Sequence, residues 1–248
     1  MSEQLEFLTP KWPAPPPVRA VMTTRRGGFS TGPYASFNLA SHVGDDPRAV
    51  AENRRRLHDA LSLPSEPQWL DQVHGRRVVN LSQPVSESAD AAVAFAPGPV
   101  AAVLTADCLP VFLASRAGDR VGLAHAGWRG MVMGVIEATV VALATDPAEL
   151  LAWLGPAIGP AAFEVGGEVR RMFVAMQPEA AADFQPGTGQ KYLADLAGLA
   201  RRRLAACGVT AVYGGDHCTV SDQPRFYSYR RDGQTGRMAA LIWLEDRP

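Results

Sequence analysis

Short runs of apolar residues alternate with turn-forming segments along most of the chain. Runs of about four to eight apolar residues bounded by Gly, Pro, Asn, Asp or Ser predict β-strands. The expected strands cover 77–81, 91–95, 100–106, 110–114, 121–126, 150–155, 209–215, 225–230 and 238–244. Several of these runs are apolar on both faces, as expected for buried central strands. Some follow one another too closely for crossover helices, so antiparallel pairing must occur.

Four longer segments have the residue spacing or the apolar content of helices. They cover 47–61, 128 to about 144, 166–176 and 192–207. Asp46 is a suitable N-cap for the first helix, Pro47 suits its first position, and Gly208 ends the last helix. Together with the strands, these helices predict an α+β (mixed α/β) fold in which β-sheet is covered by helices.

The N-terminus has a different composition from the rest of the chain. Residues 1–17 include the run KWPAPPP, and proline fixes φ and removes backbone donors, so an extended arm is expected there. The remaining residues, 18–248, contain no linker, low-complexity tract or repeat of solenoid period, so they are expected to form a single domain.

Composition restricts the partners and the compartment. The chain has 24 Lys and Arg against 25 Asp and Glu, so no bulk charge attracts nucleic acid or anionic membranes, and neither is expected as a partner. Lys11 and Lys191 are the only lysines, which disfavours Schiff-base and pyridoxal chemistry. Three cysteines cannot all pair, and no signal-peptide pattern is present, so we expect a reduced, cytoplasmic protein.

Three short motifs carry the strongest chemical signal. They are WLDQVHG, TADCLP and AHAGWRG, at residues 69–75, 105–110 and 124–130. They place His74, Cys108 and His125 at the ends of apolar runs, where functional side chains are held on turns by a rigid scaffold. Two imidazoles and one thiolate suit zinc, with a fourth position open for water or substrate. The long intervals leave an alternative open, in which the cysteine is a small core residue and the histidines are hydrogen-bonded turn residues.

A polar segment at 23–46 is dense in Gly, Ser, Asn and Arg. It contains neither a GxxxxGK[ST] phosphate loop nor a GxGxxG fingerprint, so no standard nucleotide motif is present. A cluster of turns is one interpretation, and a polar pocket lined by Arg25, Arg26, Asn38 and His42 is the other.

Two arginine-containing segments allow further interpretations. Arg129 directly precedes the expected start of a helix, where backbone amides and a guanidinium together suit a phosphate. The segment SYRRDGQTGR, residues 228–237, has the composition of a β-hairpin turn. Arg237 in that turn is expected to be solvated.

Several motifs together resemble the laccase-domain family. They are TRRGGFSTGPYASFNLASHVGDD, WLDQVHG, TADCLP, AHAGWRG, LGPAIGP and FYSYRRDGQTGRMAA. Members of that family are known as multicopper polyphenol oxidases, purine nucleoside phosphorylases or peptidoglycan editing factors. The match runs from about Val21 to Ile242. It implies a single catalytic domain of helices enclosing β-sheet layers, with a metal between His74, Cys108 and His125.

The resemblance also implies activities. These are phosphorolysis of adenosine, inosine and S-methyl-5'-thioadenosine, together with adenosine deamination, so purine nucleosides and phosphate are the expected partners. Zinc is the expected cofactor. The chain has only five histidines, and His58 and His217 are poorly placed, so it cannot build a multicopper set. One copper ion could still occupy the site in vitro, with polyphenol oxidation as a side activity.

Residues other than the three ligands are assigned roles from their positions in the motifs. Asp107 is adjacent to Cys108 and is the candidate for proton transfer during deamination. Arginines would bind phosphate, with Arg129 the first candidate and Arg54 or Arg230 behind it. The amide and imidazole of the polar segment would contact substrate.

Two other functions use the same residues. In a cysteine hydrolase that edits peptidoglycan precursors, Cys108 would be the nucleophile and His125 or His74 the base. A binding module would hold a metal without turnover. The sequence does not determine the oligomeric state.

Overall fold

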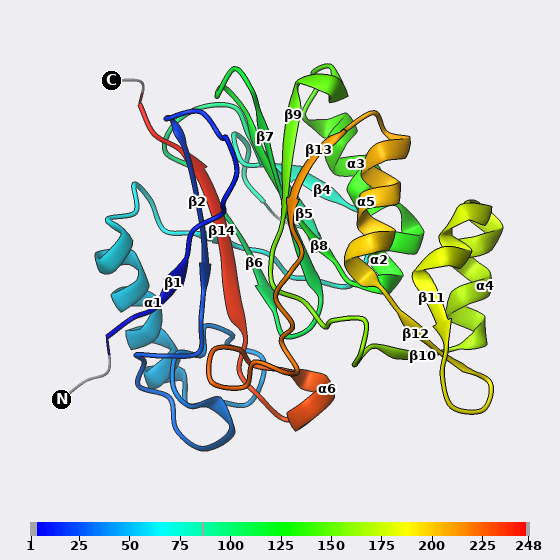
Figure 1. Cartoon of the computed structure of the whole chain (residues 1–248). Coiled ribbons are helices and arrows are strands. Elements are labelled where there is room, and N and C mark those ends of the chain that lie inside the picture. The colour runs from blue at the N-terminus through cyan, green and yellow to red at the C-terminus, as the bar shows by residue number, and fades with distance from the viewer. Residues whose placement is uncertain (1–3, 86, 247–248) are drawn as a thin grey trace.

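Two large β-sheets pack face to face at the centre of the molecule (Figure 1). The computed structural model describes residues 4–85 and 87–246. The first sheet has five strands in the order β1-β2-β14-β6-β3, namely β1 (Phe7–Leu8), β2 (Val18–Thr23), β3 (Gln68–Trp69), β6 (Val100–Thr105) and β14 (Met238–Leu244). The second has six in the order β13-β9-β7-β8-β5-β4, namely β4 (Val78–Asn80), β5 (Ala91–Ala94), β7 (Leu109–Ser115), β8 (Val121–Ala126), β9 (Leu150–Leu154) and β13 (Ala211–Gly214). A small third sheet contains β10 (Glu164–Gly166), β11 (Phe184–Pro186) and β12 (Lys191–Ala194).

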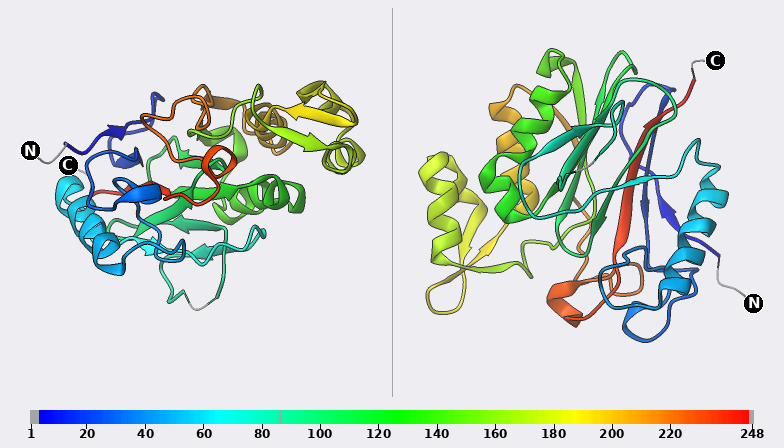
Figure 2. Two further views of the ribbon diagram at one scale, coloured as in Figure 1. Left: turned by 90° about the horizontal axis from the view of Figure 1, so that it is seen from below. Right: turned by 180° about the vertical axis from the view of Figure 1, so that it is seen from behind.

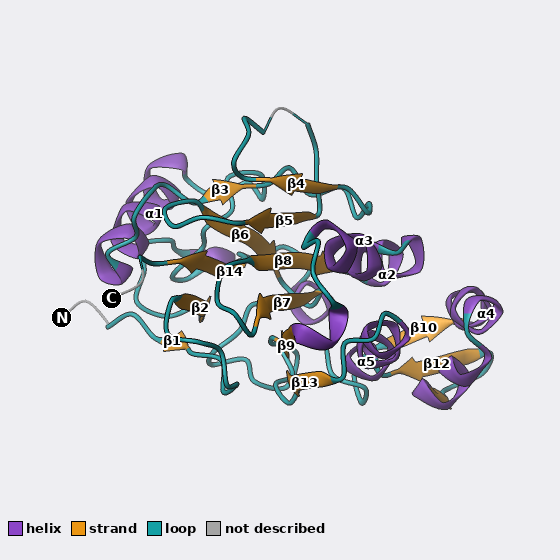
Figure 3. Ribbon diagram, turned by 90° about the horizontal axis from the view of Figure 1, so that it is seen from above, coloured by secondary structure: helices purple, strands orange, loops and turns teal. Residues whose placement is uncertain are grey.

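Helices cover the outer faces of both large sheets. The helices of the described residues are α1 (Pro47–Leu61), α2 (Trp128–Met133), α3 (Val135–Ala142), α4 (Gly167–Met176), α5 (Leu196–Ala206) and α6 (Tyr229–Asp232), with the 3₁₀ helices η1 (Gly32–Tyr34), η2 (Pro147–Glu149) and η3 (Pro178–Asp183). Helix α1 lies on the five-stranded sheet, and α2, α3 and α5 lie on the six-stranded sheet (Figures 2 and 3). Helix α4 packs beside the small sheet. No helix within the described ranges is long and apolar enough to cross a membrane.

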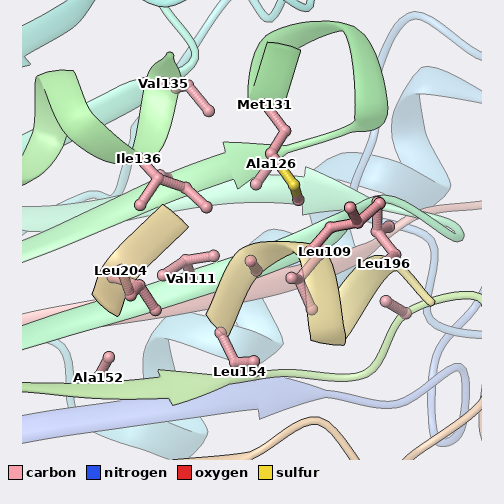
Figure 4. Close-up of a cluster of buried hydrophobic side chains, with 14 of the residues drawn as sticks. Leu109, Val111, Ala126, Met131, Val135, Ile136, Ala152, Leu154, Leu196 and Leu204 are labelled. Carbon is pink, nitrogen blue, oxygen red and sulfur yellow. The ribbon is translucent and has the colours of Figure 1, made fainter. Parts of the chain in front are cut away.

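This layering explains why the central strands are apolar on both faces. Successive side chains of a strand point to opposite sides. In β6, Ala101 and Val103 contribute to the core between the sheets, whereas Leu104 contributes to the core beneath α1. On the far side of the six-stranded sheet, Ile136 of α3 and Val111 of β7 belong to a third core (Figure 4). The predicted α+β fold, a single domain with sheet layers enclosed by helices, is confirmed.

Pairing within the sheets is mixed. Strand β7 pairs antiparallel with both β8 and β9, and β14 pairs antiparallel with β2 and β6. Parallel pairs occur at β3–β6, β4–β5 and β9–β13. The antiparallel pairing expected from the short connections is therefore confirmed.

Two predicted helices have different boundaries. The helix expected from 128 to about 144 is divided into α2 and α3 at Gly134, which has a φ of 91° and caps the end of α2. The helix expected at 192–207 begins only at Leu196, because Asp195 caps it through its side chain and the preceding residues form β12. Pairing of β12 with two neighbouring strands therefore outweighs the local helical pattern.

The strand expected at 225–230 and the hairpin expected at 228–237 were wrong predictions. Strand β14 is already paired on both sides, with β2 and β6, so no edge is free beside it for a hairpin partner. The chain instead forms the single turn α6, which Ser228 caps by accepting a hydrogen bond from the Arg231 N–H.

The N-terminal segment lies along the body of the protein. Residues 1–3 of the expected 1–17 arm are outside the described residues. From residue 4 onward the segment is largely irregular, but β1 pairs antiparallel with β2. Trp12 and Ala14 pack against the core between the sheets. The arm and domain boundaries at residue 17 stay a prediction.

Candidate functional site

The three motifs that contain His74, Cys108 and His125 meet at one end of the central sheets. His74 follows β3, Cys108 lies in the turn between β6 and β7, and His125 lies near the end of β8. The register of β7 and β8 pairs Pro110 with His125, which brings the turn before β7 beside the imidazole. The Cys108 Sγ and the His74 Nε2 are 3.8 Å apart. One potential ligand atom from each of the three residues lies within 4.8 Å of the others, so the cluster could hold a metal ion.

Asp90 supports this cluster from behind, a residue that the sequence analysis missed. The side chain is fully buried, and its Oδ1 is 2.8 Å from the His125 Nδ1. The same carboxylate accepts hydrogen bonds from the backbone N–H groups of Val73, His74 and Gly75 at 3.2, 3.0 and 2.6 Å. An ionised carboxylate only accepts, so Nδ1 of His125 carries a proton in either charge state, and in the neutral imidazole Nε2 is left to bind a metal. One side chain thereby orients one ligand and fixes the turn that carries another.

Ionisation of the cluster favours a thiolate. Burial alone would raise the pKa of Cys108, but the charge of His125 and hydrogen bonds from both histidines lower it to about 6. Burial alone would lower the pKa of His125, but the charge of Cys108 and the hydrogen bond to Asp90 raise it to about 9. Hydrogen bonds from His125 and Gly75 hold the pKa of Asp90 below its usual range in spite of its burial. A thiolate is the form of cysteine that binds metals and acts as a nucleophile.

The packing around the cluster leaves no room for a larger residue at Gly127. A Cβ atom there would lie 2.9 Å from the Cys108 Sγ and 3.0 Å from the His74 Cδ2. The donor set of one sulfur and two imidazole nitrogens is of the kind that binds zinc or copper. The residues present therefore fit a single metal ion of this class.

A cavity of about 400 Å³ opens beside the cluster. Its walls contain the three potential ligands and, of the other predicted residues, His42, Asp107, Arg129 and Arg230. The remaining lining residues are Gln72, Leu104, Thr105, Ala106, Gly127, Trp128, Ile158, Phe163, Leu196, Tyr229 and Arg237. Such a mixture of apolar walls and a few convergent polar groups is typical of small-molecule sites.

Asp107 lines the cavity but is heavily hydrogen-bonded. Its backbone has a φ of 95°, which turns the chain sharply before Cys108. The Oδ1 accepts from the Thr219 hydroxyl at 2.5 Å, and the Oδ2 accepts from the Arg230 N–H at 2.7 Å. This carboxylate therefore ties the C-terminal segment, including α6, to the turn that carries the potential thiolate ligand.

The structure places Asn38 and Arg54 outside the cavity lining. Asn38 is fully buried, and its side chain bonds to Asp45, to both backbone groups of Ala40 and to the Arg237 N–H. Arg54 stacks on an aromatic ring and donates twice to the Leu39 carbonyl. Both side chains stabilise the polar segment at 23–46 rather than face the cavity.

Arg237 was predicted to be solvated, and this prediction was wrong. The side chain is half-buried and lines the cavity, and burial lowers its pKa. Burial, followed by the charge of Arg237, also lowers the pKa of His42 at the exposed rim. Tyr229, which the sequence analysis did not single out, lies beneath the guanidinium with its ring centroid 5.8 Å from the Arg237 Cζ. Both residues lie in the motif FYSYRRDGQTGR. Its composition also fits a hairpin turn, so the local pattern did not indicate a cavity wall.

Comparison with known proteins agrees with this geometry. The family model described as "Multi-copper polyphenol oxidoreductase laccase" matches residues 19–245, a range that contains all three potential ligands. The chain belongs to this family. The resemblance inferred from the motifs is therefore confirmed.

Relatives that are similar to the chain are named for a different activity. A purine nucleoside phosphorylase of Pseudomonas aeruginosa is 56% identical over 241 residues, covering 97% of this chain and 99% of the relative. The purine nucleoside phosphorylase YfiH of Escherichia coli is 54% identical, covering 96% and 99%. The crystal structure of a Neisseria meningitidis protein matches with a TM-score of 0.92 and 49% identity over 97% of this chain and 99% of that one. YlmD from Geobacillus stearothermophilus matches with a TM-score of 0.86 and 31% identity over 99% of each chain.

Proposed function

We propose that this protein is a zinc-dependent purine nucleoside phosphorylase that acts on adenosine, inosine and S-methyl-5'-thioadenosine. The observation that carries the proposal is the cluster of His74, Cys108 and His125 on the wall of a cavity of about 400 Å³. The names of relatives that are 56% and 54% identical support the same activity. When bound by these three residues, zinc supplies Lewis acidity without redox chemistry.

Phosphorolysis requires phosphate and a nucleoside to be held together. Phosphate attacks the anomeric carbon of the ribose, and the base leaves with the electron pair of the glycosidic bond. Arg129 and Arg230 line the cavity and are the proposed contacts for phosphate. Apolar and aromatic residues of the cavity, such as Phe163 and Trp128, offer surfaces for the flat purine.

We also propose adenosine deamination in the same cavity, with Asp107 as the group that exchanges a proton with substrate. Asp107 is on the cavity wall beside Cys108. Because both of its carboxylate oxygens already accept hydrogen bonds, a substrate has to reach it beside these partners. His42 at the rim is a further proposed substrate contact.

Elemental analysis combined with nucleoside assays tests the main proposal. We expect about one zinc per chain and release of free base from adenosine and inosine only when phosphate is added. Cys108→Ala should lose both metal and activity. Its zinc affinity should fall by more than the roughly 100-fold that loss of a hydrogen-bond partner of a metal ligand causes. A metal-free wild-type protein that is inert toward nucleosides would refute it.

A cysteine hydrolase is the second candidate, because the lowered pKa of Cys108 and the contact between His125 and Asp90 resemble a Cys-His-Asp arrangement. Iodoacetamide separates the two functions. A ligand thiolate is protected when the protein is loaded with zinc, whereas a catalytic thiolate reacts in the active protein without any metal.

A multicopper polyphenol oxidase is disfavoured by the number of sites. Within residues 4–85 and 87–246, His74, Cys108 and His125 form the one group of three or more potential metal ligands. A trinuclear copper cluster requires more imidazoles than this group supplies. Copper bound at the single site would at most support a side activity.

A further inference from the structure

Arg237 is a cavity-lining cation that is attracted by the charges of Cys108 and Asp107 but forms no direct ion pair within the described part of the chain. Among the described residues, no Asp or Glu forms an ion pair with it. Other arginines of the same C-terminal segment differ in this respect: Arg225 pairs with Asp222, and Arg231 pairs with Asp232. A half-buried charge without a direct ion pair is stabilised further when an anionic ligand binds to it.

The hydrogen bonds of Arg237 leave one edge of its guanidinium free. Nη1 donates to the carbonyls of Thr235 and Gly236 at 2.8 and 3.0 Å. The backbone N–H donates to the Asn38 Oδ1 at 2.9 Å, and the backbone carbonyl accepts from the Leu39 N–H at 3.3 Å. Nε and Nη2 have no hydrogen-bond partner within the described part of the chain. These two nitrogens form the fork that binds two oxygens of a phosphate or carboxylate side by side.

The surrounding charges favour an anion. Arg129 and Arg230 also line the cavity. Asp107, the one carboxylate that the described residues contribute to its wall, has both oxygens occupied by hydrogen bonds from Thr219 and from the Arg230 N–H. Arg230 donates from its Nη1 to the carbonyls of residues 162 and 164 in the same way, but its side chain is exposed, whereas Arg237 is half-buried. Arg237 is therefore the arginine that combines burial, a fixed backbone and an unused fork.

We infer that Arg237 anchors a phosphate group in the cavity through its Nε and Nη2 edge. The identification of this ligand as inorganic phosphate, the second substrate, rests on the proposed function. The same chemistry would also recognise the phosphoryl group of a nucleotide. Arg237 thus joins Arg129 and Arg230 as a proposed phosphate contact. It replaces Arg54, which lies outside the cavity lining.

Direct binding of inorganic phosphate to the metal-loaded protein tests this inference without turnover. Calorimetric titration of Arg237→Gln should show about 10- to 100-fold weaker binding than the wild type, as expected for loss of a charge-assisted bidentate contact. Arg237→Lys keeps the charge but lacks the fork, so its affinity should fall between the two. The matched control is Arg48→Gln, which removes an exposed arginine of α1 outside the cavity and should bind phosphate like the wild type.

Adenosine monophosphate serves as a second probe that separates the two sources of phosphate. If inorganic phosphate and the nucleotide both weaken in Arg237→Gln, the anchor serves the free anion. If only the nucleotide weakens, the anchor serves a phosphoryl group attached to the nucleoside. Unchanged affinity for both probes in a folded Arg237→Gln protein would overturn the inference.

The Arg237 Nη1 also holds residues 235 and 236, so the melting temperature of each variant is measured. If the glutamine variant is unstable, a folded Arg237→Lys protein provides the test.

Kinetics distinguish failure of this inference from failure of the proposed function. In a working phosphorylase, Arg237→Gln should raise the KM for phosphate by about 10- to 100-fold and leave the KM for inosine within a few-fold of the wild type. Absence of phosphorolysis in the wild type would refute the proposed function but leave the binding result standing. An unchanged KM for phosphate in the variant would refute the role of Arg237 alone.

Discussion

One wall of the cavity is formed by strand ends, whereas another is formed by α6 and the loop after it. The sheet wall, defined as His74, Cys108 and His125, is held by buried groups: His125 is 3% exposed, and its partner Asp90 is 0% exposed. The loop wall, defined as Tyr229, Arg230 and Arg237, is more open, and Tyr229 is 62% exposed. The two walls therefore differ in how strongly their side chains are coupled to the folded core.

Because of this difference, substitutions in the two walls should have different consequences. Buried, hydrogen-bonded side chains contribute to both stability and ligand geometry, so changes in the sheet wall should affect folding and metal binding together. Exposed side chains on loops contribute little to stability and can be adapted to a ligand. Changes in the loop wall should therefore alter substrate binding while leaving the melting temperature nearly constant.

Asp90→Asn should have the largest effect among tests of this comparison. The substitution leaves the size of the side chain unchanged but removes the charge that orients His125 and accepts from the 73–75 turn. We expect zinc affinity to fall by about 10- to 100-fold, measured by competition with a chromophoric chelator. The visible spectrum of the cobalt(II)-loaded protein should change as well, which a purely structural role would not cause.

A second hydrogen-bonded carboxylate, Asp119 in the turn after β7, provides the control for Asp90. Asp119 accepts hydrogen bonds from Ser115 and Arg120 in the turn between β7 and β8, outside the cavity. Asp119→Asn should lower stability without changing zinc affinity. Equal zinc affinity in Asp90→Asn and the wild type would contradict the positioning role of Asp90.

The titration of Cys108 in the metal-free protein sharpens the comparison further. Its pKa of about 6 lies below the ordinary value of 9.0, so the thiolate is fully formed above pH 7 and is lost as the pH falls through about 6. The rate of alkylation by iodoacetamide should therefore rise about 10-fold between pH 5 and pH 7 and then level off.

Cys207 offers an internal control for this titration. Burial raises the pKa of that thiol above its ordinary value, so it should react appreciably only in alkaline solution. Mass spectrometry of peptides separates the two sites. A Cys108 profile that rises only at alkaline pH, like that of Cys207, would show that the imidazoles do not stabilise the thiolate.

The sheet wall could be predicted from the sequence to a large extent, and the loop wall could not. The strands were recognisable because each must fill a core on both faces, as Ala101 and Leu104 of β6 do. The potential ligands stand at the ends of these strands in distinctive motifs. Asp90 was missed because a single Asp before an apolar run has the same local pattern as an ordinary turn residue.

The loop wall depends on tertiary information that no local pattern contains. The composition of residues 228–237 fits a hairpin as well as the observed turn of helix and loop. The choice depends on β14 being paired on both sides, and the position of Arg237 depends on Asn38, 199 residues away in sequence. Both facts become visible only when the sheet is assembled.

Tyr229→Ala should have the smallest effect and completes the comparison. Tyr229 is exposed, lines the cavity and carries the Arg237 guanidinium over its ring. Loss of a stacking surface of this kind costs about fivefold in affinity at the low end of measured values, so we expect the KM for inosine to rise by about that factor. The melting temperature should stay close to that of the wild type because little apolar area is buried.

Phe29→Ala is the control, because it removes another exposed aromatic ring that lies outside the cavity. It should change neither the KM for inosine nor the melting temperature appreciably. If Tyr229→Ala instead destabilised the protein as much as Asp90→Asn does, the loop wall would be as tightly coupled to the core as the sheet wall, and the distinction between them would be lost.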